Sequence, residues 1–131
     1  MEEKVTIIQI YAPTDDYDPA EKDAFYEQLQ KEMDEARERS KHVIIMGDWN
    51  GRVGRDMVRG QGCIGKFAGD GIINDNGERI IDFCVENNLM IGTHFYNHKR
   101  IHQITYSALG RQAESTIDYM VYTRHTNYAI C

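Results

Sequence analysis

The chain has 131 residues and a formal net charge of −6, with 41% hydrophobic and 27% charged residues. This length fits one domain, and no apolar run approaches the roughly 18 to 20 residues of a membrane span, so we expect no membrane partner. An acidic total argues weakly against binding to nucleic acid. Residues 15–38, however, hold ten acids against three bases, so the other residues sum to +1. One acidic segment sets the total, and charge alone does not exclude a nucleic-acid partner.

The start of the chain and its cysteines bear on cellular location. The first residues, MEEKVTIIQIY, put an acidic flank before a strand pattern and lack the basic flank and cleavable apolar segment of a secretory signal. Cys63, Cys84 and Cys131 are odd in number and have no CxxC spacing. This usage disfavours a disulfide framework or a structural zinc site and predicts a reducing, intracellular environment.

The first part of the chain predicts a strand, a helix and a second strand. Residues 5–11 are β-rich and run into turn residues. Asp18 is typical of a helix N-cap, with Pro19 at the first helical position and Glu21 completing a capping box. Residues 41–48 form the next predicted strand, which suggests a crossover unit with its helix on one face of a sheet. The predicted helix carries one apolar stripe, formed by Phe25, Leu29, Met33 and Ala36.

The second part predicts a long loop, a helix and three strands. Residues 51–76 contain seven glycines and little periodicity, which indicates a surface loop. A helix over 77–87 follows, and strands are predicted at 89–96, 102–108 and 116–123, joined by turns that suit hairpins. The inward-facing residues of the helix are Ile80, Ile81, Phe83 and Cys84. We therefore predict a single α/β domain over 1–131, of the α+β sandwich type, with a mixed or antiparallel sheet and helices on one face.

Two polar side chains stand where the second predicted strand ends. An unpaired carboxylate in an apolar setting is costly, so Asp48 should have a partner such as a metal, a basic group or a polarised water. Asn50 lies two residues on, and its amide can bind a phosphate oxygen or a nucleophilic water. The alternative is an Asx-type turn in which Asp48 and Asn50 bond local backbone. The spacing alone leaves both interpretations open.

Other residues are weaker candidates. Asp118 lies inside an apolar strand pattern, where it either serves a site or forms a structural salt bridge. Tyr11 ends the first strand, where its phenol either contacts a ligand or packs on the core. The spacing of His94, His98 and His102 aligns ligands only on a helix, and here it spans a strand, a turn and a strand, so no histidine metal site is expected. The cluster of His98, Lys99 and Arg100 is a solvated turn that could meet a phosphate backbone.

Taken together, the motifs resemble the endonuclease/exonuclease/phosphatase superfamily. They are IYAPT, IIMGDWN, NDNGERIIDFCVENNLMIGTHF, HQITYSALGR and STIDYM, in that order over nearly the whole chain. The sequence is most similar to the apurinic-endonuclease-like domains of non-LTR (LINE/RTE-type) retrotransposons and to the craniofacial-development-like sequences derived from them. The resemblance covers the later part of that domain only, and implies part of a four-layer DNase I-like sandwich.

The resemblance also implies roles for the residues. Asp48 aligns or deprotonates the attacking water, Asn50 holds the phosphate and helps to place the metal, and Asp48 and Asn50 are the implied metal ligands. Tyr11 contacts the scissile phosphate, and Asp118 orients a catalytic histidine. The implied cofactor is Mg²⁺ or Mn²⁺, which neutralises the phosphate. The residues implied on the substrate side are Thr14, Trp49, Thr105, Tyr106, Ser107, Arg52, Lys99 and Arg100, and a basic track with Arg55 and Arg59 would favour a polynucleotide.

The implied function is a metal-dependent DNA endonuclease of retrotransposon type, located in the nucleus by analogy with the family. Two departures weigh against it: nothing matches the family's metal-binding glutamate or its Ser-Asp-His segment, and His125 follows Asp118 too soon to replace the histidine. The first alternative is therefore a catalytically inactive remnant that acts as a structural or interaction module. A phosphatase of the same superfamily is the second. A half-sandwich would also expose one sheet face, which predicts a homodimer or a partner that supplies the missing half.

Overall fold

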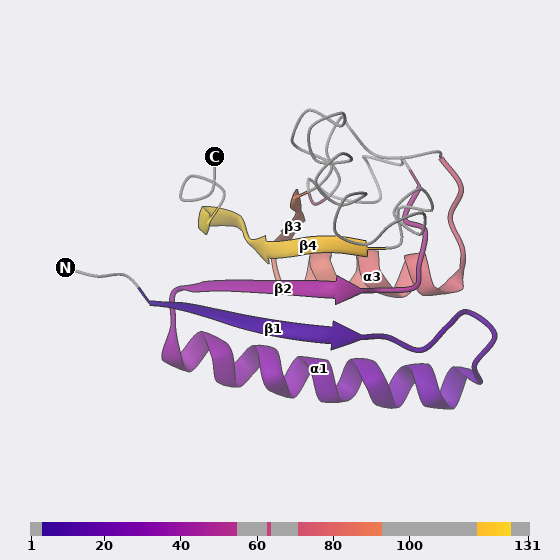
Figure 1. Cartoon of the computed structure of the whole chain (residues 1–131), viewed down its shortest axis with the longest axis horizontal. Helices are drawn as coiled ribbons and strands as arrows, with labels where there is room; N and C mark the ends of the chain where they lie inside the picture. The colour runs from indigo at the N-terminus through magenta and orange to yellow at the C-terminus, as the bar shows by residue number, and fades with distance from the viewer. Residues whose placement is uncertain (1–3, 55–62, 64–70, 93–117, 127–131) are drawn as a thin grey trace.

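The computed structural model describes residues 4–54, 63, 71–92 and 118–126, which form one mixed sheet with two long helices (Figure 1). The strand order is β1-β2-β4-β3, with β1 parallel to β2 and the other neighbours antiparallel. The predicted α/β class and mixed sheet are confirmed. The elements in chain order are β1 (Val5–Tyr11), α1 (Pro19–Arg39), β2 (His42–Asp48), α3 (Asp75–Glu86), β3 (Leu89–Ile91), β4 (Asp118–Thr123) and the 3₁₀ turn η3 (Arg124–Thr126).

Strand β1, helix α1 and strand β2 form the predicted crossover unit. Leu29, Met33 and Ala36 are buried and Phe25 packs beside them, so the apolar stripe of α1 faces the sheet as predicted. The predicted capping box is wrong at the side chain of Asp18. Asp18 is the N-cap, but its side chain makes no capping bond, and its backbone carbonyl accepts the amides of the first turn instead. Packing of the stripe therefore holds this helix rather than a side-chain cap.

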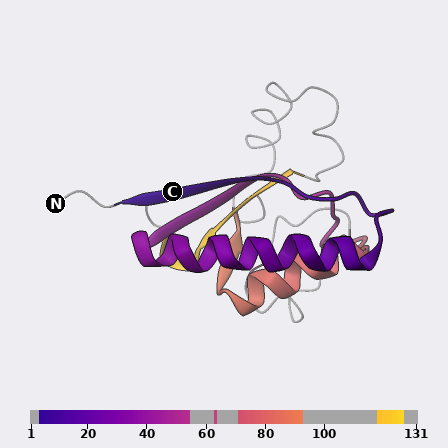
Figure 2. The ribbon, with the colours of Figure 1, turned by 90° about the horizontal axis from the view of Figure 1, so that it is seen from below.

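The two faces of the sheet differ in their cover. Both helices lie on the same side of the sheet (Figure 2). Val43 and Ile45 of β2 and Val121 of β4 are fully buried beneath them in the main core, together with Cys63 and Cys84, which are free thiols. On the opposite face, the described residues form a smaller second cluster and leave Val5 and Ile7 of β1 exposed. The members of this cluster are Ile44, Met90 and Tyr122, with Met46 and Met120 packed against it.

The segment between β2 and α3 is described mainly at its two ends, 51–54 and 71–74. Gly51, Val53 and Gly54 are buried, and Val53 forms a β-bridge with Ile73. Helix α3 then begins two residues earlier than the sequence pattern predicts, because Asn74 caps it: its side-chain oxygen accepts the Gly77 amide at 2.8 Å. The surface-loop prediction was wrong for the first end, where Gly51, Val53 and Gly54 are buried, and is confirmed for the other end, where Gly71, Ile72 and Ile73 are exposed.

Helix α3 buries all four of its predicted inward residues, Ile80, Ile81, Phe83 and Cys84. Strands β3 and β4 fall inside the predicted segments 89–96 and 116–123. The predicted strand at 102–108 and both predicted hairpin turns lie outside the described residues. Within the part of the chain that the structure describes, no helix has the length and apolar character needed to cross a membrane.

Candidate functional site

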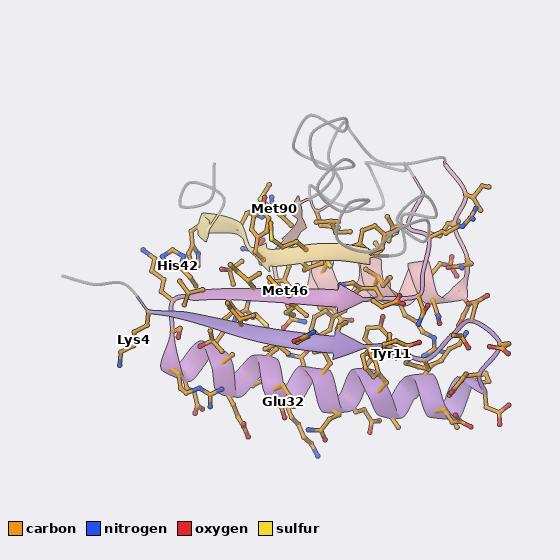
Figure 3. The ribbon with its side chains drawn as sticks, viewed as in Figure 1. Lys4, Tyr11, Glu32, His42, Met46 and Met90 are labelled. Carbon is orange, nitrogen blue, oxygen red and sulfur yellow. The ribbon has the colours of Figure 1, made fainter. Side chains whose placement is uncertain are left out.

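Three candidate positions meet in one row across the sheet. Tyr11 pairs with Asp48 in the parallel β1–β2 register, and Asp48 pairs with Asp118 in the antiparallel β2–β4 register. Figure 3 places Tyr11 at this end of the sheet and His42 at the other. Cross-strand partners are direct neighbours on a sheet. Positions far apart in the sequence therefore form one site, although for Asp118 only the backbone position is described.

The Asx-turn alternative for Asp48 is what the structure contains. One carboxylate oxygen, Oδ1, accepts the backbone amide of Asn50 at 2.9 Å. The side chain is half-buried, and the second oxygen has no hydrogen bond from any described residue. A carboxylate offers about four acceptor positions, so the turn leaves one oxygen free for a water or a cation. The turn fixes the direction of this carboxylate and leaves its second oxygen available to a ligand.

Asn50 links the end of β2 to the loop that follows β1. Its backbone is left-handed, with φ of +49°, a conformation that asparagine tolerates better than most residues. The side-chain Nδ2 donates to the Ala12 carbonyl at 2.7 Å, and the Ala12 amide donates to the Asp48 carbonyl at 2.9 Å. These bonds hold the two strand ends together.

Trp49 is buried rather than exposed to a ligand. The indole is fully buried, its Nε1 donates to the Tyr119 carbonyl at 3.1 Å, and its ring centroid lies 6.4 Å from that of Phe83. A side chain without accessible surface cannot contact a substrate in this conformation, so its implied place on the substrate side is not supported. The Tyr119 hydroxyl also donates to the Gly51 carbonyl at 2.9 Å. Trp49 and Tyr119 thus fasten the 48–51 turn to β4.

The loop after β1 carries two more candidates. Tyr11 is 76% exposed, so its phenol can reach a bound group rather than packing on the core. Thr14 donates its hydroxyl to the Asp16 carboxylate, and this bond lowers the pKa of Asp16. The Thr14 hydroxyl can still accept a hydrogen bond while it donates one. Of the two, Tyr11 is the better placed to donate to a phosphate.

The start of α3 binds both strand-end loops, and the sequence did not reveal this. Asn76 is 2% exposed, and its Nδ2 donates to the carbonyls of Asn50 at 2.7 Å and Pro13 at 2.9 Å. Asn74, besides capping α3, accepts the Arg52 amide at 3.0 Å, and its own amide donates to the Arg52 carbonyl at 3.2 Å. The motif NDNG was the only signal of this arrangement in the sequence, and by itself it indicates just a helix N-cap.

A buried lysine supports the same region from α1. Lys22 is 3% exposed, and its Nζ lies 2.9 Å from a carboxylate oxygen of Asp75 and 3.2 Å from one of Asp15. Burial opposes the charged form, but the hydrogen bonds that Lys22 donates to Asp75 and Asp15 outweigh it, so the pKa of Lys22 is raised. Hydrogen bonds from Lys22 and Arg79 lower the pKa of Asp75. Lys22 thus joins the loop after β1 to the start of α3.

The other candidates are placed as follows. Arg52 is half-buried and follows the 48–51 turn directly. His125 lies at the opposite end of the sheet, where its Nε2 is 2.6 Å from the Lys41 carbonyl, so it does not complete this site. The remaining predicted residues lie outside the described part of the chain: Arg55, Arg59, His94, His98, Lys99, Arg100, His102, Thr105, Tyr106 and Ser107.

The chemistry of the described donors is suited to a phosphate ester and a water. Asp48 supplies one carboxylate oxygen, and Tyr11, its register partner on the adjacent strand, supplies a phenolic donor at the same end of the sheet. Over residues 4–54, 63, 71–92 and 118–126, no three His, Cys, Asp or Glu side chains come together as a ligand set for a metal ion. The described donors alone therefore do not build a complete metal site.

Comparison with known proteins gives a consistent result. Residues 3–129 match the endonuclease/exonuclease/phosphatase family. Craniofacial development protein 2 of Tragulus javanicus and that of Bos taurus are each 33% identical over 117 residues, which is 89% of this chain. The chain spans about a fifth of the length of these relatives, 20% and 19% respectively. No solved structure matches it.

Proposed function

This chain belongs to the endonuclease/exonuclease/phosphatase family, and from that premise we propose that it hydrolyses phosphodiester bonds in DNA as an endonuclease of the retrotransposon type. The observation that carries the proposal is the row formed by Tyr11, Asp48 and Asp118 at one end of the sheet. Each position was singled out by residue type, and the strand register makes them neighbours. A nuclease acting on chromosomal DNA works in the nucleus, which is the location we propose.

The described side chains suit distinct steps of hydrolysis. The free oxygen of Asp48 aligns a water and accepts its proton as the water oxygen bonds to phosphorus. The P–O bond to the departing sugar oxygen breaks, and that oxygen takes a proton from solvent water. The exposed phenol of Tyr11 donates to a non-bridging phosphate oxygen, which stabilises the charge that develops there. Asn50 holds the loop of Tyr11 against the turn of Asp48 through its bond to the Ala12 carbonyl. Positioning and charge stabilisation supply most of the catalysis of phosphoryl transfer.

Members of this family generally use divalent metal ions. We propose Mg²⁺ or Mn²⁺ for this chain, held in part by the Asp48 carboxylate. Such ions take oxygen ligands and commonly bind through one or two carboxylates, the rest of the shell being waters and substrate phosphates. When bound, the ion would neutralise the phosphate charge.

A specific observation favours the first alternative, an inactive remnant that serves as an interaction module. Asp48 is already used in a turn, and the described donors form no complete ligand set for a metal. A phosphatase acting on small substrates is the second alternative, since the family includes both activities. An extended basic surface beyond Arg52 would favour DNA over a small phosphate ester.

Nicking of supercoiled plasmid by the purified chain, with Mg²⁺ or Mn²⁺ and with EDTA, tests the proposal. We expect metal-dependent nicking that falls by about a hundredfold or more in Asp48→Asn, because a preorganised catalytic group of this kind is typically worth that much. Asp34→Asn is the matched control: an exposed aspartate on α1 that only bonds Gln30. Nicking that persists in Asp48→Asn would contradict the assignment, and a folded chain that never nicks would support the inactive alternative. Release of phosphate from small monoesters in place of nicking would support the phosphatase.

We also propose that a second copy of the chain covers the open sheet face. Val5 and Ile7 of β1 are 48% and 60% exposed there, beside the cluster of Ile44, Met90 and Tyr122. The strongly acidic helix α1 lies on the other side of the sheet (Figure 2). Packing two open faces together buries apolar surface and keeps both acidic helices on the outside, far apart. Light scattering should give twice the monomer mass, and Ile7→Lys should return it to the monomer; a wild-type monomer at all concentrations would reject the second copy.

A further inference from the structure

We infer that Asn76 is a positioning residue that sets the distance between Tyr11 and Asp48, an inference that rests on the proposed phosphodiester hydrolysis. Asn76 is the second residue of α3 and is 2% exposed, so it cannot itself touch a polynucleotide. Its side chain lies between the loop that follows β1 and the turn that follows β2.

Both donors of the amide are used, one on each loop. Nδ2 donates to the Asn50 carbonyl at 2.7 Å and to the Pro13 carbonyl at 2.9 Å. The backbone amide of Asn76 donates to a carboxylate oxygen of Asp15 at 3.1 Å. Backbone carbonyls only accept hydrogen bonds, so these two partners fix which end of the amide is nitrogen. One side chain therefore bridges the loop of Tyr11 and the turn of Asp48.

The other end of the amide has an energetic cost. The Asn76 Oδ1 atom is buried and has no hydrogen-bond partner among the described residues. Most buried polar atoms in folded proteins are paired, because an unpaired one loses its bonds to water without compensation. An asparagine that leaves its oxygen unpaired while using both donors is suited to holding two carbonyls together. This arrangement favours a positioning role over a contribution to stability alone.

Two glycines let α3 approach closely enough for Asn76 to reach both loops. A Cβ on Gly77 would lie 1.6 Å from the Arg52 carbonyl oxygen, and a Cβ on Gly51 would lie 2.9 Å from the backbone carbon of Asn76. Helix and turn are thus in backbone contact at this point. A side chain at either position would force α3 away and break the bridge.

The bridge matters because in-line attack on phosphorus depends on small displacements of the reacting groups. Misplacement by about 1 Å costs about a hundredfold in rate. Asn50 already bonds the Ala12 carbonyl, and Ala12 bonds the Asp48 carbonyl, but both bonds lie at the strand ends themselves. Only Asn76, among the described side chains, ties the outer parts of both loops to the rigid start of a helix.

Asn87 provides a matched control at the other end of the same helix. It is 4% exposed, and its Nδ2 donates to Gln30 at 2.8 Å and to the Phe83 carbonyl at 2.9 Å. Both side chains use two donor contacts, and the Asn87 Oδ1 also accepts from Gln30 Nε2 at 2.9 Å and from Arg37 Nη1 at 3.4 Å. Asn87→Ala should therefore lose at least as much stability as Asn76→Ala, while only Asn76→Ala should affect the site.

The experiment measures plasmid nicking and hydrogen–deuterium exchange for wild type, Asn76→Ala, Asn76→Ser and Asn87→Ala. We expect Asn76→Ala to lower kcat by about ten- to a hundredfold with little change in KM, and to speed exchange over residues 11–15 and 48–52. Asn76→Ser keeps one donor and should fall between Asn76→Ala and wild type, and it serves if the alanine variant is too unstable. Asn87→Ala should match wild type in kcat and in loop exchange.

Equal kcat and equal loop exchange in the Asn76 and Asn87 variants would overturn the inference. A wild-type chain that does not nick would instead reject the proposed activity. Exchange over the two loops would still decide whether Asn76 holds them, so the two failures are distinguishable.

Discussion

The two faces of the sheet are built from the same strands and meet different surroundings. On the helix side, Ile45 and Val121 are fully buried, and Trp49 and Phe83 extend that core to the end of β2. On the open side, the neighbouring residue Ile44 belongs to a small cluster that does not cover β1. Alternation of side chains along a strand makes this division sharp, since each strand supplies both faces. The covered face supplies the main core of the described residues, and the open face is where we propose that a second copy packs.

The largest effect should come from Trp49, which anchors the candidate site in the covered core. Trp49→Ala should lower the free energy of unfolding by about 3–5 kcal/mol, because it leaves a large cavity and removes the hydrogen bond to the Tyr119 carbonyl. Urea unfolding followed by circular dichroism measures this. Tyr11→Ala, at an exposed aromatic residue of the same site, is the control and should change stability little. If Trp49→Ala is stable but no longer binds DNA, Trp49 contacts the substrate and its anchoring role is wrong.

A smaller effect should follow from the ion pair that supports the loop after β1. Lys22→Met keeps most of the buried stem and removes the contacts with Asp15 and Asp75. The two carboxylates are 47% and 52% exposed, so solvent screening limits the loss to about 1 kcal/mol rather than the larger cost of a fully buried pair. Thermal unfolding of both proteins at neutral pH measures it. A loss of several kcal/mol would mean that this region is as buried as the main core.

The same pair predicts how stability depends on pH. The pKa of Lys22 is raised in the folded state, so its contribution is complete below its ordinary value of 10.5 and is lost as pH rises through the folded value. The pKa of Asp75 is lowered, so its contribution is complete above 3.8 and is lost as pH falls through the folded value. This pair alone should leave the melting temperature unchanged between these limits and lower it outside them. Lys22→Met should flatten both limbs, and unchanged limbs would show that other groups cause them.

Much of the fold could be predicted because its signals are local. Strand β1 has the bounds that its β-rich run indicated, and the stripe of α1 follows helical spacing. The support of the site could not be predicted, since Asn76 reaches partners 26 and 63 positions away in the sequence and Lys22 one 53 away. Nothing in a local pattern specifies such contacts. Trp49 shows the same limit. The resemblance implied a place on the substrate side, but only the fold determines that the indole points into the core.

The smallest effect should separate the two faces most directly, by removing the same methyl group from each. Ile45→Val, on the covered face, should cost about 0.5–1.5 kcal/mol because the group it loses is closely packed. Ile7→Val, at a residue 60% exposed on the open face, should stay within about 0.5 kcal/mol in dilute protein. Both substitutions keep a β-branched side chain, so strand propensity does not confuse the comparison. Denaturant unfolding followed by the fluorescence of Trp49, the single tryptophan, measures both.

If the stability cost of Ile7→Val grows with protein concentration toward that of Ile45→Val, a second copy covers the open face, because mass action then adds association to the free energy of unfolding. If the two costs are equal even at high dilution, the open face is covered within the monomer and the division between the two faces does not hold.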